Sequence, residues 1–163
     1  MLFYLIQDRI QKILNNNLRA LGINPRSDDY VIISHEHEDH TGGLEYIASI
    51  KSSLRIYVSS DMNPYIKLWI RSLGITVVEI NDTTINYDGI AVVGQLHEPP
   101  FKQALAINIR GYGLAVIVGC NHPGVDRIVG KAFKDLGIKP YLVIRGFHLA
   151  GAFTEKLEYV VRY

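Results

Sequence analysis

The sequence predicts a single layered α/β domain, and three observations support this prediction. Short apolar runs rich in β-branched residues, such as residues 30–33, alternate with segments whose apolar residues recur every three or four positions. Glycine-containing turns separate these runs, and two of them, Asp88-Gly89 and residues 110–113, are typical of β-hairpins. The 163 residues contain no internal repeat and no linker. We therefore expect residues 1–163 to form one domain of packed strands and helices.

The first half of the chain is expected to alternate helices with strands. Apolar positions at three- and four-residue steps predict an amphipathic helix over residues 2–21, and Gly22 ends this helix. A continuously apolar run predicts a buried strand at residues 30–33. The same patterns predict a helix at 44–50, a strand at 54–58, a helix at 64–73 and a strand at 75–80.

The second half is expected to begin with hairpins. Residues 85–93 carry the first hairpin, and the second pairs residues 104–109 with residues 114–118. The remaining predicted elements are a helix at 125–136, a strand at 141–144 and a helix that begins at Thr154. Antiparallel hairpins mixed with helices favour an α/β (α+β) fold built in layers.

Composition and charge exclude several classes of protein. Hydrophobic residues make up 48% of the chain and charged residues 20%, a balance typical of a packed globular protein. Seventeen basic and sixteen acidic residues leave a net charge of +1, so we expect no nucleic-acid partner. The one cysteine, Cys120, excludes a disulfide within the chain and indicates a reducing compartment. With no apolar run of about 18 residues and no leader-like start, we expect a cytoplasmic protein that does not bind membranes.

The clearest chemical signal is a cluster of histidines that follows the first predicted strand. Three of the six histidines lie within six consecutive residues, beside Asp39. In an extended segment His35 and His37 point to the same side, so that they can share one metal ion. A glycine pair further along lets the chain turn, which would bring Asp39 and His40 to the same pocket. These two residues would then hold a second ion or a water molecule on the first.

Two further histidines, His122 and His148, each follow a predicted strand in a glycine-containing segment. Because α/β proteins build their sites at strand ends, we expect both side chains near the cluster. Imidazole groups with one carboxylate suit zinc, with iron, manganese, nickel and cobalt as alternatives, rather than calcium or magnesium. We interpret His97 as a loop residue and Cys120 as a small buried thiol.

Residues 35–40 form an HxHxDH motif, and together with Thr41-Gly42-Gly43-Leu44 they resemble the metal-binding loop of the metallo-β-lactamase superfamily. Residues 119–124 resemble the second metal motif of that superfamily. Residues 98–107 and 146–149 resemble the branch that contains the archaeal methanopterin-pathway synthase, which joins a dihydropterin to a ribofuranosylaminobenzene phosphate. The resemblance implies an αββα sandwich, here shortened at the N- and C-termini.

The resemblance also implies which residues hold metal. It assigns the first metal ion to His35, His37 and His122, the second to Asp39 and His40, and a position near the shared ligand to His148. Relatives begin with strands before the first helix and end with a further histidine, whereas this sequence is predicted to start at a helix and has no later histidine. We therefore expect about one tightly held ion per chain. Because a shortened sheet exposes its edges, we also expect a homodimer or a larger assembly.

The sequence favours a metal-dependent, hydrolase-like enzyme that acts on a small-molecule substrate through metal-activated water, with chemistry related to that of the pterin-phosphate synthase. Asp39 would be the catalytic residue that orients the water or takes its proton. The alternative hypothesis is a non-catalytic metal-binding or interaction module left by truncation of the same fold. A third hypothesis, a nucleic-acid-cleaving enzyme, is disfavoured by the even charge. The substrate stays open because this fold hosts lactone, thioester, phosphoester and redox chemistry.

Overall fold

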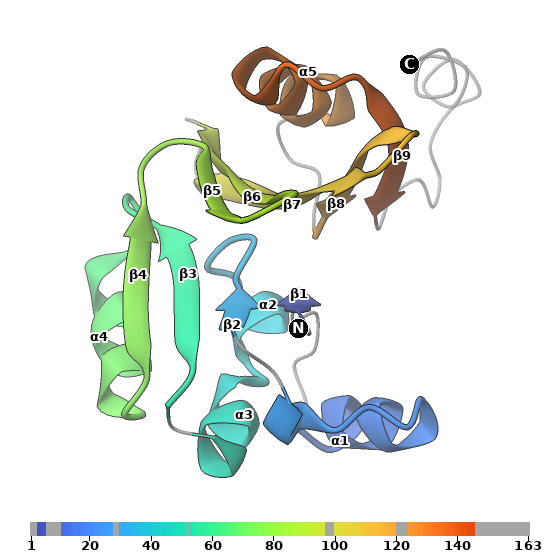
Figure 1. Ribbon diagram of the computed structural model, residues 1–163. Coiled ribbons are helices and arrows are strands. Elements are labelled where there is room, and N and C mark those ends of the chain that lie inside the picture. The colour runs from blue at the N-terminus through green and yellow to red at the C-terminus, as the bar shows by residue number, and fades with distance from the viewer. Residues whose placement is uncertain are drawn as a thin grey trace, which may run out of the picture.

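Two sheets form the framework of the protein in a computed structural model (Figure 1). The structure describes residues 3–5, 11–27, 30–51, 53–96, 100–119 and 124–145. Helices cover the outer side of each sheet, and the inner sides face each other. The αββα sandwich expected from the sequence is confirmed.

The first sheet contains four parallel strands in the order β1-β2-β3-β4. Its strands are β1 (Phe3–Leu5), β2 (Tyr30–Ile32), β3 (Arg55–Ser59) and β4 (Thr76–Ile80). The helices between these strands are α1 (Gln11–Ala20), α2 (Glu38–Thr41), α3 (Leu44–Ile50) and α4 (Pro64–Ser72), with a 3-10 turn at Pro25–Ser27. Because parallel strands all run one way, their carboxyl ends share one edge of the sheet, and the histidine cluster follows β2 at that edge.

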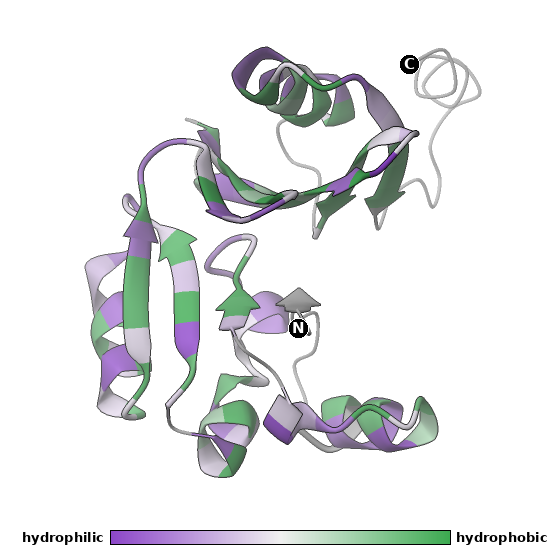
Figure 2. Cartoon of the chain, in the orientation of Figure 1, coloured by the Kyte–Doolittle hydropathy of each residue, from purple (hydrophilic) through white to green (hydrophobic). Residues whose placement is uncertain are grey.

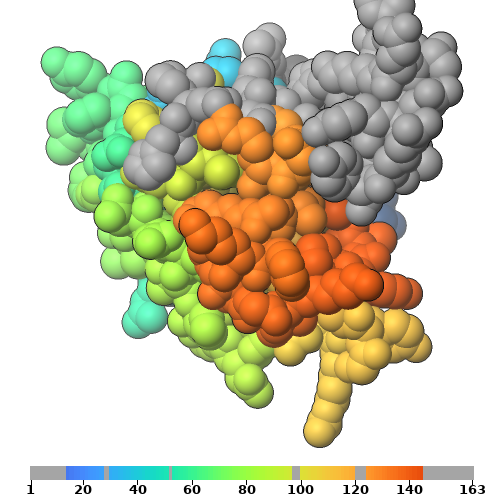
Figure 3. Space-filling view, turned by 90° about the horizontal axis from the view of Figure 1, so that it is seen from above, coloured from blue at the N-terminus to red at the C-terminus, as the bar shows by residue number. Residues whose placement is uncertain are grey.

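The second sheet contains five strands in the order β5-β6-β7-β8-β9. They are β5 (Thr84–Tyr87), β6 (Ile90–Leu96), β7 (Lys102–Ile109), β8 (Gly113–Val118) and β9 (Pro140–Arg145). The first four form antiparallel hairpins, whereas β8 and β9 are parallel because α5 (Val125–Leu136) connects them. Seen from above, α5 lies in orange across the middle of one face of the molecule (Figure 3).

The inner core between the two sheets consists of side chains that alternate along the strands. Tyr30 and Ile32 of β2 face the second sheet, while Val31 and Ile33 face the helices. The members of this inner core are Tyr30, Ile32, Tyr57, Ile80, Ile90, Val92 and Leu105. The rings of Tyr30 and Tyr57 pack edge to face, with centroids 5.2 Å apart. Burial of both faces explains why β2 is continuously apolar.

Each sheet has a second core on its outer side. On the first sheet α1, α3 and α4 cover Val31, Ile56 and Val58, and on the second α5 covers Val116 and Val118. Most hydrophobic residues of α5, green in Figure 2, lie toward the sheet, where Ile128 and Ala132 are buried, whereas Phe133 lies on the outer side with 51% of its surface exposed. In the described residues no helix is long and apolar enough to cross a membrane.

The prediction of one amphipathic helix over residues 2–21 was wrong for the first residues of that range. Residues Phe3–Leu5 form strand β1, which pairs in parallel with β2, and only Gln11–Ala20 are helical. The aromatic and aliphatic side chains of this segment suit a strand as well as a helix, and pairing with the neighbouring β2 decides between them. A strand therefore precedes the first helix, and the expectation that this chain departs from its relatives by starting at the helix was wrong. The helix predicted from Thr154 lies outside the described residues.

The remaining strands and helices predicted from the sequence are confirmed within a few residues. The helix predicted at 125–136 is α5, and both predicted hairpins are present. Gly94, on β6, allows a close crossing of the chain, because the segment that leads from β4 to β5 passes directly over it. The Gly94 backbone nitrogen donates a hydrogen bond to Thr83 Oγ1 at 3.2 Å. A Cβ atom at this position would overlap the backbone of Asp82 and Thr83.

We expect Gly94→Ala to lower the free energy of unfolding by at least about 1 to 3 kcal/mol, because backbone atoms must move to admit the new methyl group. Urea denaturation would measure this loss. Gly130→Ala is the matched control, since a Cβ there meets nothing within 4 Å and the residue lies inside α5. That control should gain about 1 kcal/mol of helix propensity. Equal stability of Gly94→Ala and the wild type would contradict this account of the crossing.

Candidate metal site

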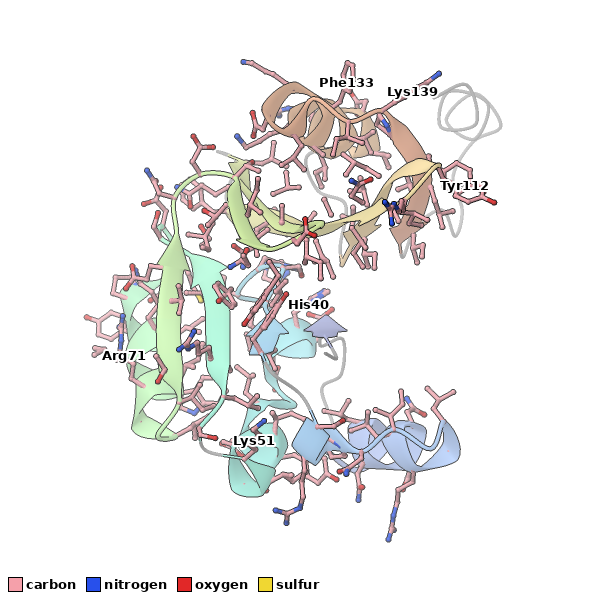
Figure 4. The ribbon with its side chains drawn as sticks, viewed as in Figure 1. His40, Lys51, Arg71, Tyr112, Phe133 and Lys139 are labelled. Atoms are coloured by element: carbon pink, nitrogen blue, oxygen red, sulfur yellow. The ribbon has the colours of Figure 1, made fainter. Side chains whose placement is uncertain are left out.

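The histidine cluster begins directly after β2, at the carboxyl edge of the first sheet. The backbone continues in the sheet for one more residue, because Ile33 N donates to Tyr57 O at 3.0 Å. The cluster then ends in the short helix α2, whose first hydrogen bonds join the amides of His40 and Thr41 to His37 O. Figure 4 shows His40 where the end of β2 meets the second sheet, far from Tyr112 on the β7–β8 hairpin.

His35 and His37 form the first donor pair. His35 Nε2 and His37 Nδ1 are 3.0 Å apart, and the ring centroids are separated by 4.5 Å. His35 is buried, whereas His37 is exposed. Two nitrogen ligands on a tetrahedral zinc ion lie about 3.3 Å apart, because each zinc–nitrogen bond is about 2.0–2.1 Å. The spacing of these two nitrogens therefore fits the edge of a metal coordination shell, and both side chains point to one place as the sequence predicted.

Asp39 and His40 form a second donor pair on α2. His40 Nε2 lies 3.4 Å from Asp39 Oδ2, and the His40 ring is buried. The ring centroids of His40 and His35 are 4.1 Å apart, so the two donor pairs are neighbours. A nitrogen and a carboxylate oxygen at this distance are of the type that binds zinc or iron. The expectation that the glycine pair makes the turn was wrong, because Gly42 and Gly43 have φ angles of −61° and −77°, which any residue adopts. The helix α2, which precedes them, brings Asp39 and His40 back toward His35.

Ser34 contacts the histidines of both pairs. Its Oγ lies 3.0 Å from His35 Nδ1 and 3.2 Å from His40 Nδ1, and the side chain is buried. The sequence analysis gave this serine no role. Metal-binding histidines usually form a hydrogen bond through the ring nitrogen that does not bind the metal. A serine directly before the predicted ligand His35 could therefore have been recognised from the sequence as a hydrogen-bond partner.

Two contacts with distant segments, made by Gln103 and by Glu36, fix the loop that carries the cluster. Gln103 of β7 donates its backbone N–H to Ser34 O at 3.0 Å, and its side-chain amide donates to Ile33 O at 2.7 Å. Glu36 Oε2 accepts a 2.6 Å hydrogen bond from the backbone nitrogen of Asn63, at the start of α4. Sequence reasoning missed both residues, because their partners lie far away in the chain and only the fold brings them together.

The other two predicted metal ligands, His122 and His148, lie outside the described residues. Among the side chains that the structure does describe, no three of the types His, Cys, Asp and Glu are gathered as a complete set of metal ligands. The structure therefore brings together four of the predicted site residues, in two pairs. The residues present fit parts of a metal site, and a complete shell needs at least one more donor.

A polar cavity of about 320 Å³ lies between the carboxyl end of the first sheet and α5, lined by Asn81, Asp82, Gln95, Leu96, Arg127 and Lys131. Lys131 Nζ forms ion pairs with Asp82 at 3.0 Å and with Asp135 at 2.9 Å. Partial burial opposes the charged form of Lys131, but the two hydrogen-bonded carboxylates raise its pKa above the ordinary value. The charge of Lys131 is thus balanced within the protein, so this lysine is not a ready anion-binding group.

Known proteins share both the sequence pattern and the fold of this chain. The profile of the metallo-beta-lactamase superfamily matches residues 5–126. The chain is 30% identical, over 191 aligned positions, to the 7,8-dihydropterin-6-methyl-4-(beta-D-ribofuranosyl)-aminobenzene-5'-phosphate synthase of Methanocaldococcus jannaschii. That alignment covers 90% of this chain but only 65% of the synthase.

Solved structures show the same fold. A metal-dependent hydrolase of the β-lactamase superfamily superimposes with a TM-score of 0.71 at 22% identity, covering 98% of this chain and 71% of the hydrolase. A quorum-quenching N-acyl homoserine lactone lactonase gives a TM-score of 0.53 at 16% identity, covering 81% and 64% of the two chains. Since the superfamily profile spans most of the sequence, including the histidine cluster at the end of β2, this chain belongs to the metallo-β-lactamase superfamily.

Proposed function

We propose that the protein is a metal-dependent hydrolase-like enzyme. The observation that carries this proposal is the approach of His35 Nε2 and His37 Nδ1 to 3.0 Å, beside Asp39 and His40 at the carboxyl edge of the sheet. Zinc suits this donor set, and iron, manganese, nickel and cobalt are the alternatives. His122 and His148 are proposed as the further ligands, on the sequence motifs alone.

A divalent metal bound at this site would lower the pKa of a water molecule toward 7 and polarise the oxygen atom under attack. His35 and His37 hold their nitrogens at ligand spacing, and the buried His35 fixes the inner side of the site. Asp39 lies at the exposed start of α2, where its carboxylate can orient the water and accept its proton. Asp39 is therefore the proposed catalytic residue.

The relatives suggest the substrate class. The synthase from Methanocaldococcus jannaschii is named for a dihydropterin and a ribofuranosyl-aminobenzene phosphate, and the lactonase for an N-acyl homoserine lactone. We propose a small-molecule substrate with an electrophilic carbonyl or phosphoryl centre, or a reaction related to that of the synthase. The net charge of +1 supports a small-molecule substrate over a nucleic acid. The single cysteine indicates a reducing environment, which supports a cytoplasmic location.

A second candidate is a metal-binding or interaction module without catalytic activity. The observation that favours it is that the described side chains form two donor pairs and no complete set of three ligands. Both candidates require metal, and they differ in turnover. Metal binding with no turnover of phosphodiesters, lactones or thioesters would support the module.

We expect the purified protein to contain about one tightly held zinc or iron ion per chain, and His37→Ala to lose most of it, because each ligand nitrogen contributes directly to affinity. His148→Ala should lose less. Plasma emission spectrometry measures the metal content. Glu38→Gln is the control, since Glu38 is the exposed neighbour of His37. A wild-type protein that takes up no metal would overturn the proposal.

Asp39→Asn should separate the two candidates. The change keeps the shape of the side chain but removes its charge, so we expect turnover to fall by about 10²–10⁴-fold, the usual contribution of a general base. Screening of phosphodiesters, lactones and thioesters with the wild type comes first, followed by turnover and melting of the variant. A variant with wild-type turnover would remove Asp39 from the mechanism, and one that only melts earlier would give it a structural role.

We also propose that the chain forms a homodimer or a larger assembly. Leu142 and Ile144 project from β9 with 42% and 49% of their surfaces exposed, and within the described ranges β9 pairs only with β8. Such an edge can associate with another chain. We expect Ile144→Lys to shift the sedimentation coefficient toward the monomer, while Leu68→Lys, at another exposed apolar position, on α4, leaves it unchanged. A monomeric wild type at micromolar concentration would contradict the proposal.

A further inference from the structure

We propose that Ser34 is a positioning residue that holds His35 and His40 in the same ring tautomer and thereby couples the two halves of the metal site. This inference rests on the proposed function, because it concerns how the protein's own side chains prepare for metal. It assigns a role to a hydroxyl group that is itself neither a ligand nor in the predicted set of site residues.

The contacts of the two rings carry the argument. Each ring turns its Nδ1 toward the Ser34 hydroxyl, at 3.0 Å for His35 and 3.2 Å for His40. The opposite nitrogen of each ring, Nε2, lies beside another candidate ligand, which is His37 for the first ring and Asp39 for the second. In both rings, therefore, Nδ1 faces the protein interior and Nε2 faces the candidate metal positions.

Metal binding at Nε2 needs a lone pair there, so the ring proton of a neutral histidine must be on Nδ1. A serine oxygen has two lone pairs and can accept two N–H groups at once. Ser34 Oγ can thus accept Nδ1–H from both His35 and His40. A group that could only donate would select the opposite tautomer and turn the proton toward the metal.

The buried and fixed position of Ser34 strengthens its preference for the Nδ1-protonated tautomer of both rings. The residue is 1% exposed, and its carbonyl oxygen accepts the Gln103 amide from the second sheet at 3.0 Å. Water therefore has little access to replace the hydroxyl, and the backbone that carries it is fixed by both sheets. Loss of the hydroxyl would remove the Ser34 contact from Nδ1 of both rings, so the first and second donor pairs should weaken together.

The test compares Ser34→Ala, Ser34→Thr and Ser59→Ala. Ser59 is the matched control, because it is also 1% exposed and ends β3 at the same sheet edge, but its hydroxyl bonds to Gln95 and not to a histidine. Competition with a chromophoric chelator measures the affinity for Zn²⁺. We expect Ser34→Ala to lose about 10- to 100-fold in affinity, as other residues that support metal ligands do. Ser34→Thr, which keeps the hydroxyl, should recover most of this affinity, and Ser59→Ala should bind as the wild type.

Long-range ¹⁵N NMR of the histidine rings gives a second readout that loss of stability alone would not change. In the metal-free wild type, where no ion fixes the tautomer, His35 and His40 should both carry the proton on Nδ1, and in Ser34→Ala both rings should also populate the form protonated on Nε2. A wild type with either ring protonated on Nε2 overturns the inference even where Ser34→Ala fails to fold. Unchanged affinity in a folded Ser34→Ala overturns this inference alone, whereas a wild type that binds no Zn²⁺ overturns the proposed function and the inference with it.

Discussion

The attachment of the end of β2 to both sheets is the constraint on which the rest of the site depends. Ile33 N bonds to Tyr57 O within the first sheet, and Gln103 of the second sheet donates to Ser34 O and Ile33 O. The Gln103 side chain also donates to Tyr57 O at 2.8 Å. The histidine motif thus starts from backbone that is fixed from two directions, and the loop inherits its geometry from the sandwich.

This attachment explains why residues 35–41, which are all polar, can hold a defined conformation. Residues 35–41 have little apolar surface of their own, so hydrophobic burial cannot order them. Their order comes from the backbone bonds at Ser34 on one side and from the Glu36 contact with Asn63 on the other. Each of these bonds joins the loop to a distant segment. The bond between Gln103 and Ser34 is buried and therefore costly to break, whereas the bond between Asn63 and Glu36 is exposed.

Sequence patterns correctly predicted the elements whose structure depends mainly on neighbouring residues in the chain. The helix α5 has an amphipathic repeat, and the Asp88-Gly89 turn fits a hairpin, so both were predicted from the sequence. Strand β1 was missed because its apolar residues satisfy two patterns and only pairing with β2 selects one. The pairing of His35 with His37 followed from spacing and strand geometry, whereas Asp39 and His40 were expected to return through the glycine pair and are brought back by α2 instead. The roles of Gln103 and Glu36 could not follow, since their partners are set by the packing of distant segments.

The contact between His35 Nε2 and His37 Nδ1 also has a consequence for the protons of the site. As a hydrogen bond of 3.0 Å it requires a proton on one of the two nitrogens, whereas a metal ion bound between them requires both to be bare. A metal ion held between the two nitrogens would take the place of that proton, so metal binding and proton movement at this pair of rings would be linked.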